Sequence, residues 1–254
     1  MCLILLAQNP TPELALVVAA NRDEFHRRPT LPADFWLDYP NLLAGKDQEA
    51  GGTWLGVTRT GRFAAITNCR DGTSAETSPE ALPARSRGAL PLDFLAGDMP
   101  APDYLNQVAA NGHEYRGFNL LVRDQQALWY YGNHQDKKQG KPVELAPDCY
   151  GLSNQALNCD WPKVVEGQAR LKALMAQGGN PQPKSPQWLT ESLFALLTDE
   201  GDEREFSNSF IRGDEYGTRA ATVVIITTNG EVHFEEQSFG VQGAPTGRQR
   251  HAFG

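Results

Sequence analysis

Pairs of short apolar stretches separated by turn residues recur along the chain. The first pair, Cys2–Ala7 and Leu14–Ala20, flanks the turn-rich segment Gln8–Pro12. This pattern predicts a β-hairpin, because proline and asparagine interrupt extended runs. Three further hairpins are predicted over residues 53–67, 118–131 and 221–235. In the last of them, Asn229-Gly230 predicts a two-residue turn.

Between the hairpins, apolar residues recur at helical spacing. Helices are predicted over residues 86–95, 103–110, 160–176 and 186–197. Hairpins followed by blocks of helix, without strict strand–helix–strand alternation, favour antiparallel sheets covered by helices. A chain of 254 residues has the length of one large domain or two small ones. We predict a single domain over residues 1–254.

Charge and cysteine usage narrow the possible functions. A net charge of -8 disfavours nucleic acid or an anionic membrane as partner, because both require a basic surface. The acidic run 199–205 is expected to be a solvated loop. Neither the four cysteines nor the five histidines have metal-ligand spacing, so we predict no metal site and no disulfide framework. The chain shows no signal-peptide pattern and no apolar run of about 18 residues, which predicts a cytoplasmic protein without an integral membrane segment.

The residue that follows the initiator Met1 is a cysteine. Removal of Met1 would give Cys2 a free α-amine beside its thiol. An α-amine with a pKa of about 8 can accept the proton of a thiol whose pKa is about 8.5. Cys2 would then be nucleophile and base in one residue. The alternative is that Cys2 is a small buried apolar residue of a strand.

The run Asn21-Arg22-Asp23-Glu24 ends the second strand of the first predicted hairpin. Because a hairpin lays the end of its second strand beside the start of its first, Arg22 and Asp23 are expected near Cys2. The Arg22 guanidinium would favour the Cys2 thiolate, and the Asp23 carboxylate would hold the α-ammonium group. The alternative is a surface ion pair at a strand end. Adjacent strand residues point to opposite faces, so whether both side chains address Cys2 stays open.

Four short motifs, in this order, resemble the NRDE family, which is also called the transport and Golgi organisation family. They are Met1-Cys2-Leu3, the Asn21–Glu24 run with Arg28-Pro29, the turn Gly51–Gly56, and Tyr216–Arg219. The resemblance extends from Cys2 to about Phe239. It implies an α+β fold similar to that of the N-terminal nucleophile hydrolases, a four-layer αββα sandwich of antiparallel sheets. From the motifs, Asn21, Gly52 and Trp54 are expected to contact a ligand.

Within that fold, the cysteine acylases that include penicillin V acylase and bile salt hydrolase offer a more distant comparison. Their catalytic set resembles Cys2, Arg22, Asp23, Asn68, Asn154 and Arg219 in this chain. Asn68 and Asn154 each follow a short apolar strand, from which an amide can donate to an oxyanion. Arg219 could bind a substrate carboxylate. The alternatives are turn-forming asparagines and a structural ion pair.

Two functions from different classes follow. The first is a hydrolase of amide or related C–N bonds, in which Cys2 attacks a carbonyl, its own amine moves the proton, and Asn68 or Asn154 stabilises the oxyanion without a cofactor. The second is a non-catalytic carrier, because the resemblance implies intracellular trafficking of haem or of a lipid or acyl-CoA ligand. The sequence has no Cys-Pro pair and no Cys-x-x-Cys-His attachment motif, so haem would be held by burial or by a single Cys or His. The expected partner is a small molecule in both cases.

Overall fold

A computed structural model describes residues 2–69, 85–133, 140–177 and 186–254, and the chain divides into two compact units. The first unit comprises Met1–Arg28, Pro147–Ser153 and Leu157–Gly254, and the second comprises Pro29–Ala146 and Asn154–Ala156. In the described residues every strand pair is antiparallel and four α-helices are present. The prediction of a mixed α+β protein with antiparallel sheets is therefore confirmed. The four-layer stacking and the single domain stay predictions.

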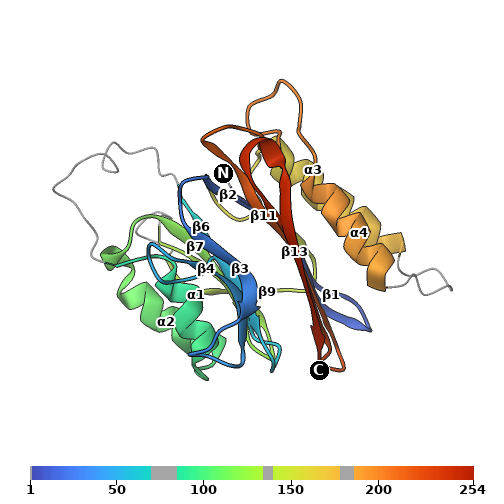
Figure 1. Cartoon of the computed structure of the whole chain (residues 1–254). Coiled ribbons are helices and arrows are strands. Elements are labelled where there is room, and N and C mark those ends of the chain that lie inside the picture. The colour runs from blue at the N-terminus through green and yellow to red at the C-terminus, as the bar shows by residue number, and fades with distance from the viewer. Residues whose placement is uncertain (1, 70–84, 134–139, 178–185) are drawn as a thin grey trace. The chain divides into compact units, whose positions relative to one another are not determined.

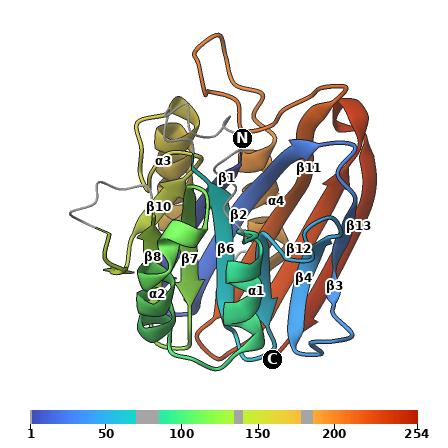
Figure 2. The same ribbon diagram turned by 90° about the vertical axis from the view of Figure 1, so that its left-hand side faces the viewer.

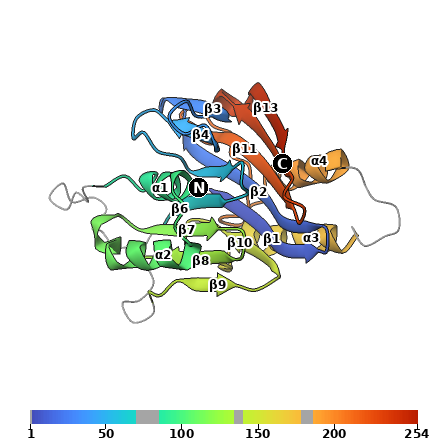
Figure 3. The ribbon, with the colours of Figure 1, turned by 90° about the horizontal axis from the view of Figure 1, so that it is seen from below.

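The first unit is built on a six-stranded sheet of order β10-β1-β2-β11-β12-β13. The strands are β1 (Leu3–Thr11), β2 (Leu14–Phe25), β10 (Cys149–Leu152), β11 (Tyr216–Thr227), β12 (Val232–Phe239) and β13 (Pro245–Phe253). Helix α3 (Pro162–Gln177) packs on β1 and β10, and α4 (Pro186–Leu197) packs on β2 and β11. The two helices lie side by side (Figure 1) and cover one face of the sheet (Figure 3).

The core of the first unit lies between this sheet and its helices. Leu5 on β1 and Val223 on β11 both lie opposite Ala19 of β2, and all three are buried under α3 and α4. Because strand residues alternate between faces, the neighbours of these residues in the chain point away from the helices. This alternation decides which side chains at the end of β2 share a face with Cys2.

The second unit is built on a seven-stranded sheet of order β3-β4-β5-β6-β7-β8-β9. The strands are β3 (Thr30–Phe35), β4 (Leu42–Asp47), β5 (Leu55–Thr58), β6 (Phe63–Asn68), β7 (Phe118–Arg123), β8 (Leu128–Gly132) and β9 (Val143–Leu145). Helix α1 (Ala89–Ala96) packs on β5, β6 and β7, and α2 (Ala101–Ala110) packs on β8, so both lie on one face (Figure 2). Phe94, Leu105 and Phe118 are fully buried between these layers.

All four predicted hairpins and all four predicted helices are present; α4 has the predicted bounds, and the boundaries of the other elements shift by up to a few residues. The two-residue turn predicted at Asn229-Gly230 is wrong. The strands pair as far as Ile226 and Val232, the Thr227 N–H donates to the Glu231 carbonyl, and residues 228–230 form the loop. Gly230 has a φ of 94°, which is the left-handed residue that a three-residue loop requires.

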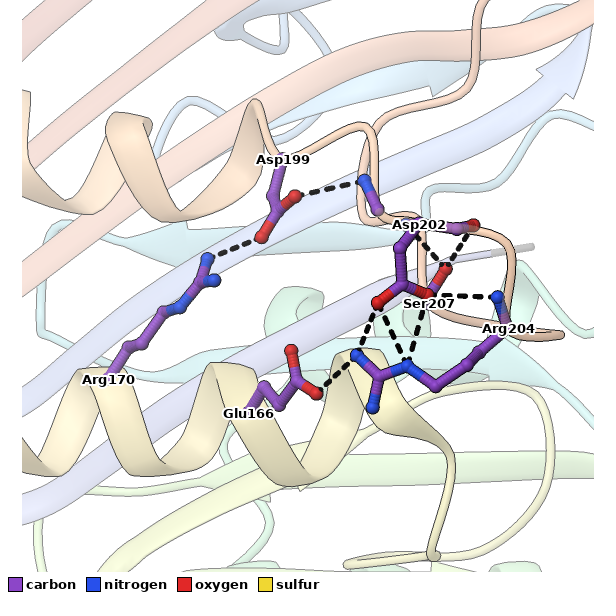
Figure 4. Close-up of polar contacts among 7 residues, drawn as sticks. Glu166, Arg170, Asp199, Asp202, Arg204 and Ser207 are labelled. Carbon is purple, nitrogen blue, oxygen red and sulfur yellow. Dashed lines mark hydrogen bonds and ion pairs between the residues drawn. The ribbon is translucent and has the colours of Figure 1, made fainter.

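The acidic run 199–205, which lies between α4 and β11, is largely exposed, as predicted, and two of its residues form ion pairs with α3. Arg204 Nη2 lies 2.6 Å from Glu166 of α3 and 2.6 Å from Asp202, and Asp199 pairs with Arg170 of α3 (Figure 4). Hydrogen bonds from Arg204 lower the pKa of Asp202 to about 2. The loop is therefore tied to α3 by a charge network that stays ionised at neutral pH.

No helix in the described part of the chain is long and apolar enough to cross a bilayer.

Candidate active site around Cys2

Cys2 immediately precedes β1, at the end of the sheet where β2 finishes. Leu3 pairs with Asn21 of β2, so one further step along the register sets Cys2 opposite Arg22. Opposed residues of an antiparallel pair share a face, and the Cys2 Sγ atom also lies 4.0 Å from the main-chain oxygen of Asp23. The structure thus brings Cys2, Arg22 and Asp23 together, although twenty residues of hairpin separate them in the sequence.

Arg22 is a buried cation on the same face as the thiol. Its side chain is 6% exposed, and its guanidinium lies 3.7 Å from the Glu24 carboxylate, which in turn lies 3.9 Å from Arg28. β2 lies between β1 and β11 in the sheet, and on the β11 side the backbone of Arg22 pairs with that of Ala220. A buried guanidinium beside a thiol favours the thiolate over the thiol, so Arg22 opposes the effect of burial on Cys2.

The Asp23 carboxylate is held on the other face of β2. Asp23 Oδ1 accepts a hydrogen bond from Thr218 Oγ1 at 2.7 Å, and Thr218 Oγ1 accepts one from the Ile211 N–H at 2.9 Å. The hydroxyl of Tyr216 donates to the Asp23 main-chain oxygen at 3.2 Å. Sequence reasoning missed Thr218 and Tyr216 as supports of the site, although both belong to the motif Tyr216–Arg219.

Burial raises the pKa of the Cys2 thiol above its ordinary value, and the Asp23 carboxylate acts in the same direction. The positive charge of the chain terminus and that of Arg22 lower the pKa, but not enough to reverse the shift. The thiol is therefore protonated at neutral pH. Cys2 needs a base to become a nucleophile.

This shift predicts the pH dependence of alkylation in the chain that retains Met1. At pH 8, Cys2 should react with iodoacetamide more slowly than N-acetylcysteine does, because a raised pKa leaves less thiolate at that pH. The rate should continue to rise at a pH where N-acetylcysteine has reached its plateau. Peptide mapping of the alkylated cysteine against pH measures this, and a rate at Cys2 that reaches its plateau before that of N-acetylcysteine would contradict it.

Ser153 fixes the main chain of Cys2. The Ser153 hydroxyl donates to the Cys2 carbonyl oxygen at 2.6 Å, and the side chain is fully buried directly after β10. Because β10 pairs with β1 from Ile4 to Ala7, this bond extends the anchoring of Cys2 beyond the end of the strand pairing. Sequence reasoning did not select Ser153, although it stands next to the predicted Asn154.

Arg219 lies at a bulge in β11, between Thr218 and Ala220. Its Nη1 atom donates to the main-chain oxygens of Phe25, His26 and Arg28, at 3.0, 3.0 and 3.3 Å. Burial lowers the pKa of Arg219, and the nearby Arg22 adds to the effect. The guanidinium therefore closes the turn that follows β2. Its predicted role toward a substrate carboxylate stays a prediction, and the Nε atom has no partner among the described residues.

Asn21 points to the helix side of the sheet. Its Nδ2 atom donates to the Leu197 carbonyl at the end of α4, at 2.7 Å, and to the Ser209 carbonyl at 2.8 Å. The side chain is 2% exposed. These contacts join β2, the end of α4 and the segment after the acidic run, on the face of the sheet opposite to Arg22. Ligand contact by Asn21 stays a prediction, and the geometry gives this residue a structural task.

The two predicted asparagines of the oxyanion site lie together in the second unit. Asn154 Nδ2 donates to the main-chain oxygen of Asn68, which ends β6, at 2.8 Å. Asn154 is 5% exposed, and its Oδ1 atom has no partner in the described part of the chain. Next to it, the Gln155 carbonyl accepts bonds from Asn119 and Cys69. The predicted catalytic residues thus fall into two groups, one in each unit.

Gly52 and Trp54, which were expected to contact a ligand, lie in the second unit beside close backbone approaches. A Cβ atom on Gly52 would lie 2.3 Å from the carbonyl carbon and oxygen of Gly88, and a Cβ on Gly45 would lie 2.2 Å from the Trp54 ring. Glycine at 52 lets two chain segments meet, and glycine at 45 in β4 leaves room for the Trp54 ring. Ligand contact by either residue stays a prediction.

The described residues contain no group of three or more His, Cys, Asp or Glu arranged to hold a metal ion. The four cysteines are free thiols; Cys69 and Cys149 are buried, while Cys2 and Cys159 are half-buried. Cys159 therefore serves as the matched control for any reaction at Cys2.

Comparisons with known proteins agree on one family. A family model described as "Transport and Golgi organisation 2" matches residues 1–240. The chain is 36% identical to the "Transport and Golgi organization protein 2 homolog" of Bos taurus and 34% identical to that of Homo sapiens. Both matches cover 94% of this chain and 93% of the relative. The "Transport and Golgi organization protein 2" of Drosophila melanogaster is 23% identical over 94% of this chain and 92% of its own length.

Proposed function

We propose a function for a chain that belongs to the transport and Golgi organisation 2 family: hydrolysis of amide or related C–N bonds, with Cys2 as the nucleophile after removal of Met1. The observation that carries the proposal is the position of the Cys2 thiol, which lies opposite the buried Arg22 while Ser153 holds the Cys2 carbonyl. A protonated thiol in that place requires a base, and the α-amine of Cys2 is a base on the same residue.

The reaction has two halves. In the first, the α-amine takes the thiol proton and the thiolate sulfur attacks the substrate carbonyl, so that a C–S bond forms. The C–N bond then breaks, and the proton passes from the α-ammonium group to the leaving amine. In the second half, water attacks the thioester, the acid leaves, and the proton returns to sulfur. Arg22 stabilises the thiolate in both halves.

The oxyanion of each tetrahedral intermediate needs hydrogen-bond donors. Asn68 and Asn154 are proposed for this task because both are amides and lie together at the end of β6. Asp23 is proposed to act on the α-ammonium group through its charge, since its carboxylate influences the titration of Cys2. Carriage of haem, or of a lipid or acyl-CoA ligand, stays a prediction from the resemblance, and none of the contacts described above favours it over hydrolysis.

The test is the intact mass of the purified protein before and after exposure to a thiol-reactive acylating probe. We expect a chain that lacks Met1 and carries one acyl group. The label should be lost in Cys2→Ala and kept in Cys159→Ala, the control at the other half-buried cysteine. Equal labelling of Cys2→Ala and of the unchanged protein would show that Cys2 is not the nucleophile and would contradict the proposed hydrolase function. A titration with haem that produced a shifted absorption spectrum would then favour the carrier.

A further inference from the structure

A groove of about 1060 Å³ opens in the second unit, at the end of the sheet where β6 begins. The turns β3–β4, β5–β6 and β7–β8 form its walls, together with the connection between α1 and α2 that Figure 2 shows along the same end. Buried Leu42 and Leu95 and half-buried Trp129 contribute apolar surface. None of the residues predicted for catalysis or ligand contact lines the groove, so it is available for a separate task.

Exposed apolar side chains gather at this groove. Leu37 is 98% exposed, and Tyr39 and Met99 are 39% and 40% exposed. Tyr39 lines the groove, while Leu37 and Met99 each adjoin a lining residue. Single exposed apolar residues are ordinary, but three around one groove form a surface that gains free energy when a partner covers it.

The charges of the groove are mostly acidic, and three of its carboxylates make no close polar contact with another described side chain. The side chains of Asp38, Asp98 and Glu144 line it, are exposed, and make no hydrogen bond or close ion pair with any described residue, although the charge of Asp98 acts on Arg62 in the direction that raises the pKa of its guanidinium. A fourth carboxylate, Asp124, is already used, because it accepts bonds from the N–H groups of residues 101, 126 and 127. Three carboxylates are thus available to an incoming ligand.

Arg62 is the basic side chain among the described lining residues, and it is committed to the framework. Its Nη2 atom donates to the main-chain oxygens of Phe94 and Met99, at 3.1 and 2.8 Å, and its guanidinium stacks 3.9 Å above the Phe94 ring. The groove therefore offers negative charge without a cation that could bind an anion. Because the groove is negatively charged and has apolar side chains at its rim, it favours a ligand that is cationic and partly apolar.

We propose that this groove binds a basic peptide segment of a partner protein, in which arginine or lysine side chains meet Asp38, Asp98 and Glu144 and an apolar side chain covers Leu37. A second copy of this chain fits less well, because each chain has a net charge of -8 and the two would repel each other. A volume of about 1060 Å³ lies at the upper end of the range for small-molecule pockets, and a peptide of several residues fills it. This proposal does not depend on the chemistry of Cys2.

The test is the fluorescence anisotropy of a labelled nine-residue peptide of alternating arginine and leucine, titrated with the full chain at two salt concentrations. The groove variant Asp38→Asn/Asp98→Asn/Glu144→Gln should bind at least about 10-fold more weakly. The control variant Glu13→Gln/Glu203→Gln/Glu231→Gln changes the net charge equally, at exposed carboxylates of the first unit, and should bind within about 2-fold of the unchanged chain. Affinity should fall with added salt.

A second variant, Leu37→Ser, tests the apolar contact without a change of charge and should weaken binding by at least about 3-fold. All the substituted residues are exposed, so each variant is expected to fold, and circular dichroism verifies it. Equal losses of affinity in the groove and control triple variants would show that binding depends on net charge alone, and this would overturn the proposal. Undetectable binding of the peptide to the unchanged chain would overturn it as well. So would competition by spermine at the same affinity as the peptide, because spermine has no apolar side chain to cover Leu37.

Discussion

A lysine inserted between Met1 and Cys2 should slow the acylation of Cys2 by about 100-fold or more. The insertion keeps the thiol and its surroundings but places the Cys2 nitrogen in a peptide bond, which cannot accept a proton. General-base assistance contributes about 10²- to 10⁴-fold to such reactions. Burial has raised the pKa of the thiol, so little thiolate is present to react without that base. The reaction is quenched at successive times, and the fraction of acylated chain, measured by intact mass, gives the rate.

The control for this insertion is the chain without the inserted lysine, compared in two forms, with and without Met1, which intact mass distinguishes. Only the form without Met1 should acylate at the full rate, and treatment of the other form with a methionine aminopeptidase should restore it. Equal rates in the processed, unprocessed and lysine-bearing chains would show that the α-amine takes no part. The nucleophile would then need a base from elsewhere, and the proposed mechanism would be wrong.

Local sequence signals predicted the hairpins and the helices, because both are set by residues close together in the chain. The strands that escaped prediction, β3, β4, β9 and β13, have weaker local signals. β9 has only three residues, β3 and β13 are mostly exposed, and β4 is a short buried run without period-two alternation. Such strands exist because a neighbouring strand offers its free edge, as β12 does for β13. Pairing of this kind depends on residues far apart in the sequence.

The contacts of the candidate site also divide into some that local sequence predicts and some that depend on distant residues. The approach of Arg22 and Asp23 to Cys2 follows from one hairpin, so the sequence could predict it. The supports of the site depend on the pairing of β2 with β11, across nearly two hundred residues. That pairing brings Thr218 to the Asp23 carboxylate, and a bulge beside it sends Arg219 to the turn after β2. Because β2 and β11 are buried along almost their whole length, on both faces, neither strand has an alternation of apolar and polar residues that a one-residue bulge would interrupt.

Asn21 shows how a conspicuous motif residue can serve the framework. Its position in the run Asn21–Glu24 suggested ligand contact, yet the side chain lies on the helix side of β2 and is almost fully buried. There it satisfies the carbonyls of Leu197 and Ser209. A buried carbonyl without a donor costs about 1–3 kcal/mol. The largest effect on stability is therefore expected at Asn21.

Replacing Asn21 with leucine should lower the free energy of unfolding by about 2–4 kcal/mol, because leucine keeps a branched side chain with the same number of heavy atoms but has no donor for the two carbonyls. Urea denaturation followed by circular dichroism measures the shift of the midpoint. The matched control is Asn106→Leu, the same change at an exposed position of α2, where about 0.5 kcal/mol or less is expected. Equal, small losses in both variants would mean that the two bonds of Asn21 contribute little. A large loss at Asn21 alone would show that the end of α4 and the segment after it hold β2 in place behind Arg22, so that Cys2 and Arg22 depend on contacts made from the opposite face of their own sheet.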